Sequence, residues 1–356
     1  MWRFFLLLSI FSFFFPPYIC AKKGNTDFIF TENCRNAYQL IFRLRYNDAE
    51  SFLNAEKSIN PSNKIPLLLN NYIDILTIIT TDSEEEFKKR IDNFDDRIDE
   101  FEDGDVTSPY YLYSMAESHV FKAIAKIRFE EYFTAAIELH SAKSLLDENK
   151  EKFPDFHLNL KWLGVLHCIA GTIPDNYRWV SDIFGYNGSI EQGTQELGLL
   201  LLKADVNDDV LMEKNEIQLL LSLIHLSFIY DKPYIRGLIH DMMPSCKDNP
   251  LMSYVTAIMA MKTNQNELAL NLLSKEKNNS FCFISYQLGI ARLNNLDPRA
   301  TATLEEFLSC YKGRLTVKAT YMKLAWSKII IGDIRGYKTY MDNVKTHGIE
   351  SIDEDK

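Results

Sequence analysis

The sequence predicts an all-α protein built from stacked antiparallel helix hairpins, an α-solenoid. Three observations support this fold class. Apolar residues recur at helical spacing along most of the chain, and the alternating patterns typical of strands are rare. The 14 glycines and 11 prolines in 356 residues are too few for the many tight turns of a β-sandwich or barrel. Hydrophobic residues make up 46% of the chain, which is ordinary globular composition and excludes wholesale disorder.

Residues 1–21 have the layout of a signal peptide. Arg3 precedes an apolar run at 4–15, which would rise only about 18 Å as a helix, short of the ~30 Å hydrocarbon slab. Two prolines end this run, and Ala21 offers a small residue for cleavage. We expect export, with the periplasm as the destination. A lipoprotein acylated at Cys20 and an uncleaved anchor are the alternatives, and the bulky Ile19 before Cys20 argues against acylation.

The mature chain begins with a segment, 22–30, that we expect to be flexible, and the helical-repeat domain follows over 31–347. We expect no transmembrane segment in the mature chain, because no later run reaches the eighteen apolar residues that a spanning helix needs. Prolines stand at or just ahead of periodic segments, where a missing N–H costs nothing. These prolines are Pro66, Pro109, Pro174, Pro233, Pro250 and Pro298.

One helix is predicted in detail over Glu84–Asp103. Apolar residues recur there at steps of four and three, which places them on one stripe: Phe87, Ile91, Phe94, Ile98 and Phe101. Ser83, followed three residues later by Glu86, predicts a capping box at its start. The surrounding run 82–105 contains twelve acidic and four basic residues, either a solvated helix face or an electrostatic docking surface.

The C-terminal third contains an internal repeat of small residues. Ala257, Gly289 and Ala325 lie in the first helices of three predicted hairpins, 32 and 36 residues apart. Small residues in the second helices are expected to face them, because two helices cross closely only where side chains are small. Those partners are Ala269, then Ala300 with Ala302, then Gly336, and the pairs Ala37–Ala49 and Ala123–Ala135 repeat the twelve-residue gap upstream.

This pattern resembles the tetratricopeptide repeat superfamily in a divergent form. Leu288-Gly289 retains the Leu-Gly pair of the first helix, whereas the family's aromatic residues there are mostly absent. Segment 164–197, with its Phe184–Gly188 insertion, and the closing Lys323–Trp326 segment are similar to tetratricopeptide-like proteins related to the inclusion-body-clearance and outer-mitochondrial-membrane family. The resemblance implies a helical-repeat fold, protein binding or scaffolding, and no catalytic residues.

In the frame of this repeat, the concave face of the first helices predicts a groove for a protein or peptide partner. Aromatic and thioether side chains suit such a surface because they supply burial without fixed partners. Packing of the same side chains against neighbouring repeats is the alternative. The predicted groove residues are Tyr254, Met261, Lys262, Tyr286, Asn294, Met322 and Trp326.

No residue set in the sequence predicts catalysis, a cofactor or a metal site. The seven histidines form no close ligand pair, and P-loop, GxSxG and GxGxxG motifs are absent. The formal charge of −10 argues against nucleic acid as a partner, because such binding needs a basic face. Of the six cysteines, Cys282 and Cys310 on adjoining helices could form a disulfide, a point that the sequence leaves open.

We therefore expect an exported, non-catalytic helical-repeat protein that mediates protein–protein interaction or scaffolding in the cell envelope. The alternative is a helical accessory protein that binds a hydrophobic small molecule or lipid in its concave groove. A disordered acidic tail is predicted over 348–356, because Ile352 is the only apolar residue of 350–356 that could attach it.

Overall fold

The computed structural model describes residues 27–172, 188–276, 281–350 and 355. All regular structure in this part of the chain is helical, which confirms the predicted fold class. In chain order the helices are α1 (Glu32–Phe42), α2 (Tyr46–Ile59), α3 (Ile65–Thr81), α4 (Glu84–Arg90), α5 (Asn93–Glu102), α6 (Pro109–Arg128), α7 (Tyr132–Lys152), α8 (Asn159–Thr172), α10 (Ile190–Lys203), α11 (Asp208–Met212), α12 (Lys214–Ile224), the π-helix η2 (His225–Ile229), α13 (Lys232–Met242), the 3-10 helix η3 (Met243–Cys246), α14 (Pro250–Lys262), α15 (Asn266–Lys275), α16 (Phe283–Asn294), α17 (Ala300–Cys310), α18 (Val317–Ile330) and α19 (Ile334–Thr346).

Five hairpins share one turn, which establishes the repeat. The turn residue has a positive φ in each, and it lies seven residues after the small residue singled out in the first helix. The next amide donates to a carbonyl five residues back at 2.8–2.9 Å, the bond that closes a Schellman turn. The turn residues are Leu44, Glu130, Asn264, Leu296 and Gly332.

Helix starts follow the prolines and caps of the sequence. Pro66, Pro109, Pro233 and Pro250 occupy the first turn of α3, α6, α13 and α14, and Pro298 lies two residues before α17. Ser83 caps α4 by accepting the Glu86 amide at 3.4 Å. Pro174 and the insertion at Phe184–Gly188 fall almost wholly within 173–187, outside the described residues.

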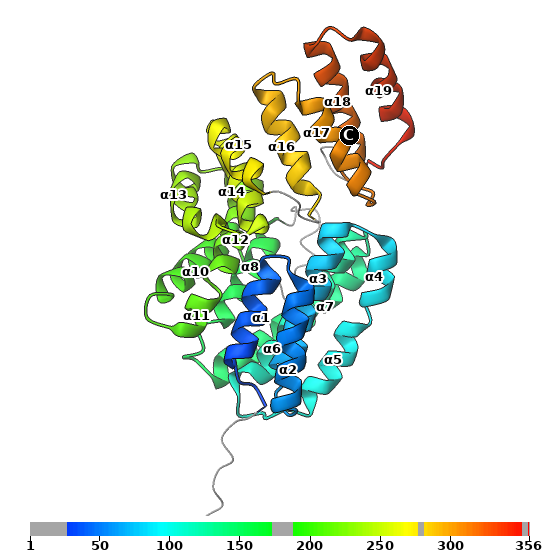
Figure 1. Cartoon of the computed structure of the whole chain (residues 1–356). Helices are drawn as coiled ribbons and strands as arrows, with labels where there is room; N and C mark the ends of the chain where they lie inside the picture. The colour runs from blue at the N-terminus through cyan, green and yellow to red at the C-terminus, as the bar shows by residue number, and fades with distance from the viewer. Residues whose placement is uncertain (1–26, 173–187, 277–280, 351–354, 356) are drawn as a thin grey trace, which may run out of the picture.

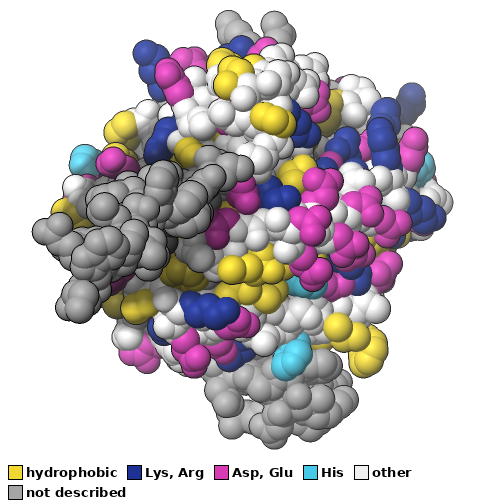
Figure 2. Space-filling view, turned by 90° about the horizontal axis from the view of Figure 1, so that it is seen from below, with side chains coloured by type: hydrophobic (Ala, Val, Ile, Leu, Met, Phe, Trp, Pro, Cys, Tyr) yellow, Lys and Arg dark blue, Asp and Glu magenta, His cyan; other side chains and the backbone are white. Residues whose placement is uncertain are grey.

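The helix predicted over 84–103 is two helices in the structure, because a turn at residues 91–92 separates α4 from α5. Its apolar stripe still faces the core, with Phe87, Phe94 and Phe101 buried. This turn lies beside Asp74 of α3. The Asp74 carboxylate forms an ion pair with Arg90 of α4 and accepts a hydrogen bond from the side-chain amide of Asn93 in α5 at 3.0 Å. Most acidic residues of this run are exposed. Acidic side chains also gather on one side of the molecular face in Figure 2.

Small residues permit close helix crossings, as the repeat predicts. A Cβ on Gly289 would lie 2.5 Å from a methyl carbon of Leu304 in α17. Of the two predicted partners, Ala300 is buried and Ala302 is exposed, and the atoms nearest to Gly289 belong to Leu304. A second crossing joins α8 to α10, where a Cβ on Gly164 would meet the Gly193 carbonyl oxygen at 2.9 Å.

The C-terminal hairpins α14 to α19 stack into an arm above the N-terminal half (Figure 1). Asp82, the buried αL residue that ends α3, fastens this arm. Its Oδ2 accepts the Tyr311 hydroxyl at 3.0 Å and the amides of Arg314 and Leu315 at 2.8 and 2.9 Å. Its Oδ1 accepts Arg128 Nε at 2.8 Å. One carboxylate therefore joins α3, the end of α6 and the loop between α17 and α18.

Two features near the C-terminus complete the fold. A disulfide joins Cys282 to Cys310 across α16 and α17, with a Cα–Cα distance of 5.8 Å. In the tail, Glu350 pairs with Lys318, and Asp355 accepts the amides of Thr316 and Ala319 at 2.7 and 2.8 Å. Asp355 therefore caps otherwise unpaired amides at the start of α18. The disordered tail expected over 348–356 stays a prediction, because residues 351–354 and 356 lie outside the described part of the chain.

The expected signal peptide, 1–21, lies outside the described residues. In the part of the chain that the structure describes, no helix combines the length and apolar character needed to cross a membrane.

Candidate functional site

The first helices of the last three hairpins, α14, α16 and α18, form one side of the arm. Their small residues Ala257, Gly289 and Ala325 are buried, which leaves another face of each helix to line two adjoining cavities. The volumes are about 320 and about 400 Å³, and both cavities contact Ile290, Asn294 and Lys323. We call this continuous surface the inner groove; its lining residues are Ile258, Met261, Lys262, Tyr286, Gln287, Ile290, Leu293, Asn294, Ala319, Lys323, Trp326, Ile329 and Ile330.

Five of the seven predicted groove residues line this surface. Met261, Lys262, Tyr286 and Asn294 contact the smaller cavity, and Asn294 and Trp326 contact the larger one. The structure thus brings together side chains from α14, α16 and α18 that are about one repeat apart in sequence.

Tyr254 and Met322 are not among the lining residues. The Tyr254 ring packs against Phe281 and Phe283, at centroid distances of 5.0 and 6.2 Å. Met322 is half-buried. Tyr286 touches the groove but is only 2% exposed, because its ring packs on Phe307 at 5.1 Å. Packing against neighbouring repeats, the alternative that the sequence left open, therefore accounts for the position of the Tyr254 ring and for the burial of Tyr286.

The exposed part of the inner groove is both apolar and basic. Trp326 is 46% exposed, and Ile329 and Ile330 beside it are also exposed. Lys323 Nζ lies 4.3 Å from the Trp326 ring centroid, a cation–π contact. The lining residues include two lysines and no acid, although the chain as a whole has a charge of −10.

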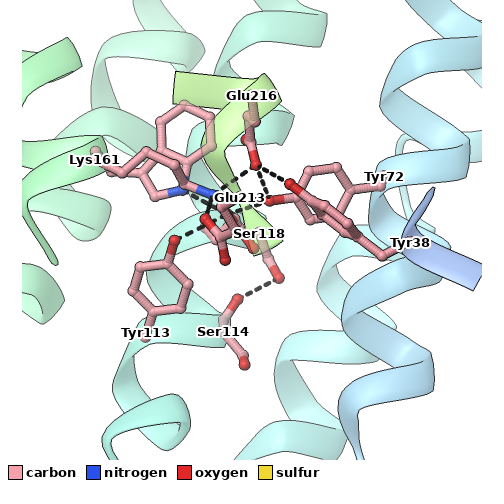
Figure 3. Close-up of polar contacts among 10 residues, drawn as sticks. Tyr38, Tyr72, Tyr113, Ser114, Ser118, Lys161, Glu213 and Glu216 are labelled. Carbon is pink, nitrogen blue, oxygen red and sulfur yellow. Dashed lines mark hydrogen bonds and ion pairs between the residues drawn. The ribbon is translucent and has the colours of Figure 1, made fainter. Parts of the chain in front are cut away.

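A second polar constellation, which the sequence did not predict, lies in the core of the N-terminal half. Lys161 of α8 is fully buried, and its Nζ donates to three carboxylates: Glu117 of α6 at 2.7 Å, Glu213 at 2.7 Å and Glu216 of α12 at 3.0 Å. Figure 3 shows Lys161, Glu213 and Glu216 pointing toward one another. We call Lys161 and its three glutamates the buried cluster.

Tyrosine hydroxyls and an indole complete the buried cluster. Tyr38 of α1 and Tyr72 of α3 each donate to Glu216 Oε2 at 2.9 Å. Trp162 Nε1 donates to Glu117 Oε1 at 2.6 Å, and the Lys161 ammonium lies 4.9 Å from the Trp162 ring centroid. The buried cluster thus joins α1, α3, α6, α8 and α12 through one ammonium group.

Charge is unevenly matched in the buried cluster, because one lysine faces three glutamates. Burial disfavours the Lys161 ammonium, but the carboxylates of Glu117, Glu213 and Glu216 outweigh burial and raise the pKa of Lys161 well above its usual value. Burial raises the pKa of Glu213 to about 8, against the lowering effect of Lys161, and it also raises the pKa of Glu216. Burial therefore favours the protonated form of the Glu213 carboxyl, whereas Lys161 favours the charged form.

The chemistry open to the buried cluster is limited by access. Lys161 is 0% exposed, so its amine has no contact with solvent. The geometry favours a structural role, in which Lys161 and the carboxyl groups around it hold five helices together. A lone lysine in the apolar segment 160–166 is a sequence sign of a buried charge. Its acidic partners lie 44 to 55 residues away, so the sequence does not identify them.

Comparisons with known proteins do not assign this chain to a family. No model of a protein family matches this chain, and no curated protein matches it.

Proposed function

We propose that this chain is an exported, non-catalytic helical-repeat protein of the cell envelope that binds a segment of a partner protein in its inner groove. The observation that carries the proposal is the composition of that groove: exposed apolar side chains and two lysines, with no acid, in an acidic chain. The tetratricopeptide-like pattern of the sequence and the signal-peptide layout of residues 1–21 support the same proposal.

The groove chemistry indicates the kind of segment. Trp326, Ile329 and Ile330 form an apolar wall suited to an aromatic or aliphatic side chain. Lys262 and Lys323 lie on the same surface and favour a carboxylate next to that side chain. The expected ligand is an extended or helical segment with an apolar residue beside an acidic one.

Site-specific crosslinking in cells tests this proposal. A photo-reactive amino acid at the exposed Asn294 should trap one protein, and mass spectrometry of the crosslinked peptide should identify a segment of the stated composition. Lys323→Met and Trp326→Ala should each reduce that crosslink by about tenfold or more. The matched control places the same group at Phe133 on α7, which is 74% exposed and outside the groove. Equal capture from both positions, or capture unaffected by Lys323→Met, would contradict the proposal.

The alternative function, binding of a hydrophobic small molecule or lipid, rests on a different surface. An apolar cavity of about 620 Å³ lies between α10 and α13, with Leu199, Leu202 and Tyr234 in its lining. Added Cβ atoms on Gly198 and Gly237 would meet no neighbour within 4 Å, so both positions border open space. A lipid or other apolar compound retained through purification, and displaced by Gly237→Phe, would support this alternative over peptide binding.

A further inference from the structure

Another cavity, distinct from the inner groove and from the apolar cavity between α10 and α13, lies where the N-terminal hairpin meets the middle of the chain. Its volume is about 460 Å³, within the usual range for small-molecule sites. One wall comes from α1 and its C-terminal end; the opposite wall comes from α11, α12, η3 and the residues after η3. We call it the basic cavity; its lining residues are Arg35, Tyr38, Gln39, Phe42, Arg43, Asp208, Leu211, Met212, Asn215, Pro244, Ser245, Lys247 and Asn249.

The basic cavity has an excess of positive charge. Its lining contains three cations, Arg35, Arg43 and Lys247, and a single acid, Asp208. Arg35 is partly engaged, because its Nε donates to the Phe30 carbonyl at 3.2 Å and its Nη2 lies 3.9 Å from Asp209. Among the residues that the structure describes, neither Arg43 nor Lys247 has a side-chain hydrogen bond or an ion-pair partner. Both are therefore available to an anion.

The remaining lining is apolar on one side and neutral polar on the other. Phe42, Leu211 and Met212 supply apolar contact. The Tyr38 hydroxyl already donates a hydrogen bond to Glu216 at 2.9 Å, and the Tyr38 side chain is only 3% exposed. Tyr38 therefore contributes mainly ring surface to the cavity wall. Asn215 accepts a bond from the Ser245 hydroxyl at 2.7 Å, which orders the polar side.

We propose that the basic cavity is a binding site for a small organic anion, one with a carboxylate or phosphate group and a compact apolar body. The guanidinium of Arg43 presents a fork that matches such an anionic group, and Lys247 adds a second point charge. Phe42 and Met212 cover the apolar body. Because the walls come from segments about 200 residues apart in sequence, a bound anion also fastens α1 to η3.

Calorimetric titration with phenyl phosphate and with benzoate tests this site, because each probe combines an anionic group with a ring. We expect saturable binding of at least one probe by the full mature chain, with a matching rise in melting temperature. Phenol, which lacks the anionic group, should bind at least about tenfold more weakly. Arg43→Met and Lys247→Met should each weaken binding by about tenfold, and Arg43→Lys should recover part of the loss.

Lys262→Met serves as the matched control, since it removes a cation of the inner groove and leaves the basic cavity intact. It should leave phenyl phosphate binding unchanged, which separates this site from the proposed function. Circular dichroism checks that each variant is folded. Saturable binding of neither probe by the wild type, or equal affinity in the wild type and Arg43→Met, would overturn the proposal.

Discussion

Replacement of Glu213 by glutamine should make the stability of this protein less dependent on pH. The carboxyl of Glu213 is buried, which raises its pKa from an ordinary 4.5 to about 8. At a pH between these two pKa values, the folded protein keeps a proton on Glu213 that the unfolded chain releases. A rise in pH therefore favours unfolding, and the stabilisation that is complete below the ordinary pKa is lost as pH rises through the folded-state pKa.

The magnitude follows from this window. One carboxyl group changes the free energy of unfolding by at most about 1.4 kcal/mol for each pH unit, and by about 3.5 kcal/mol in total between pH 5 and pH 8. Glutamine cannot ionise, but its carbonyl can still accept the bond that Lys161 Nζ donates to Glu213 at 2.7 Å. Glu213→Gln should therefore remove this contribution while the contact to Lys161 remains.

Urea unfolding followed by circular dichroism at four pH values from about 5 to 8 measures the effect. Glu56→Gln is the matched control: burial disfavours the Glu56 carboxylate, but hydrogen bonds from Thr31 and from Asn63, Asn60 and Asn33 outweigh burial and lower its pKa below the ordinary 4.5. The stability that Glu56 contributes is lost only as pH falls below 4.5, so the control should lower stability without altering the slope from pH 5 to 8. Parallel curves for the wild type and Glu213→Gln would refute the reasoning.

Three further outcomes test the fold. Lys161→Met removes the only ammonium of the buried cluster and should cost about 3–5 kcal/mol, with a smaller loss at pH 5 than at pH 8, as measured by urea unfolding. Gly289→Leu should cost about 1–3 kcal/mol, because any Cβ there must displace Leu304; an unchanged melting temperature would contradict the hairpin register. Asp82→Ala should cost about 3–5 kcal/mol and increase amide exchange over residues 311–316, since the amides of Arg314 and Leu315 lose their acceptor; unaltered exchange there would mean that the arm is held by other contacts.

The sequence by itself determined the local architecture. Helical periodicity, first-turn prolines and the serine cap each involve residues within one or two turns, so they can be read without knowledge of the fold. The repeat was equally accessible, because Ala257, Gly289 and Ala325 recur at intervals of 32 and 36 residues. Five of the residues that this register predicted for the groove line the inner groove, whereas the Tyr254 ring packs against Phe281 and Met322 is half-buried outside the lining.

Only the tertiary structure decided which charged residues are buried and which cations meet. Glu117 and Glu216 are indistinguishable in sequence from glutamates on a solvated helix face, and nothing local shows that both contact Lys161. Asp82 belongs to an acidic run, yet it is buried against a loop 229 to 233 residues away. Arg43 and Lys247 become neighbours of one cavity only because the solenoid brings α1 against η3. The physical reason is that periodicity encodes the face of a helix that is buried, whereas long-range pairing depends on how the repeats curve and which distant face covers them.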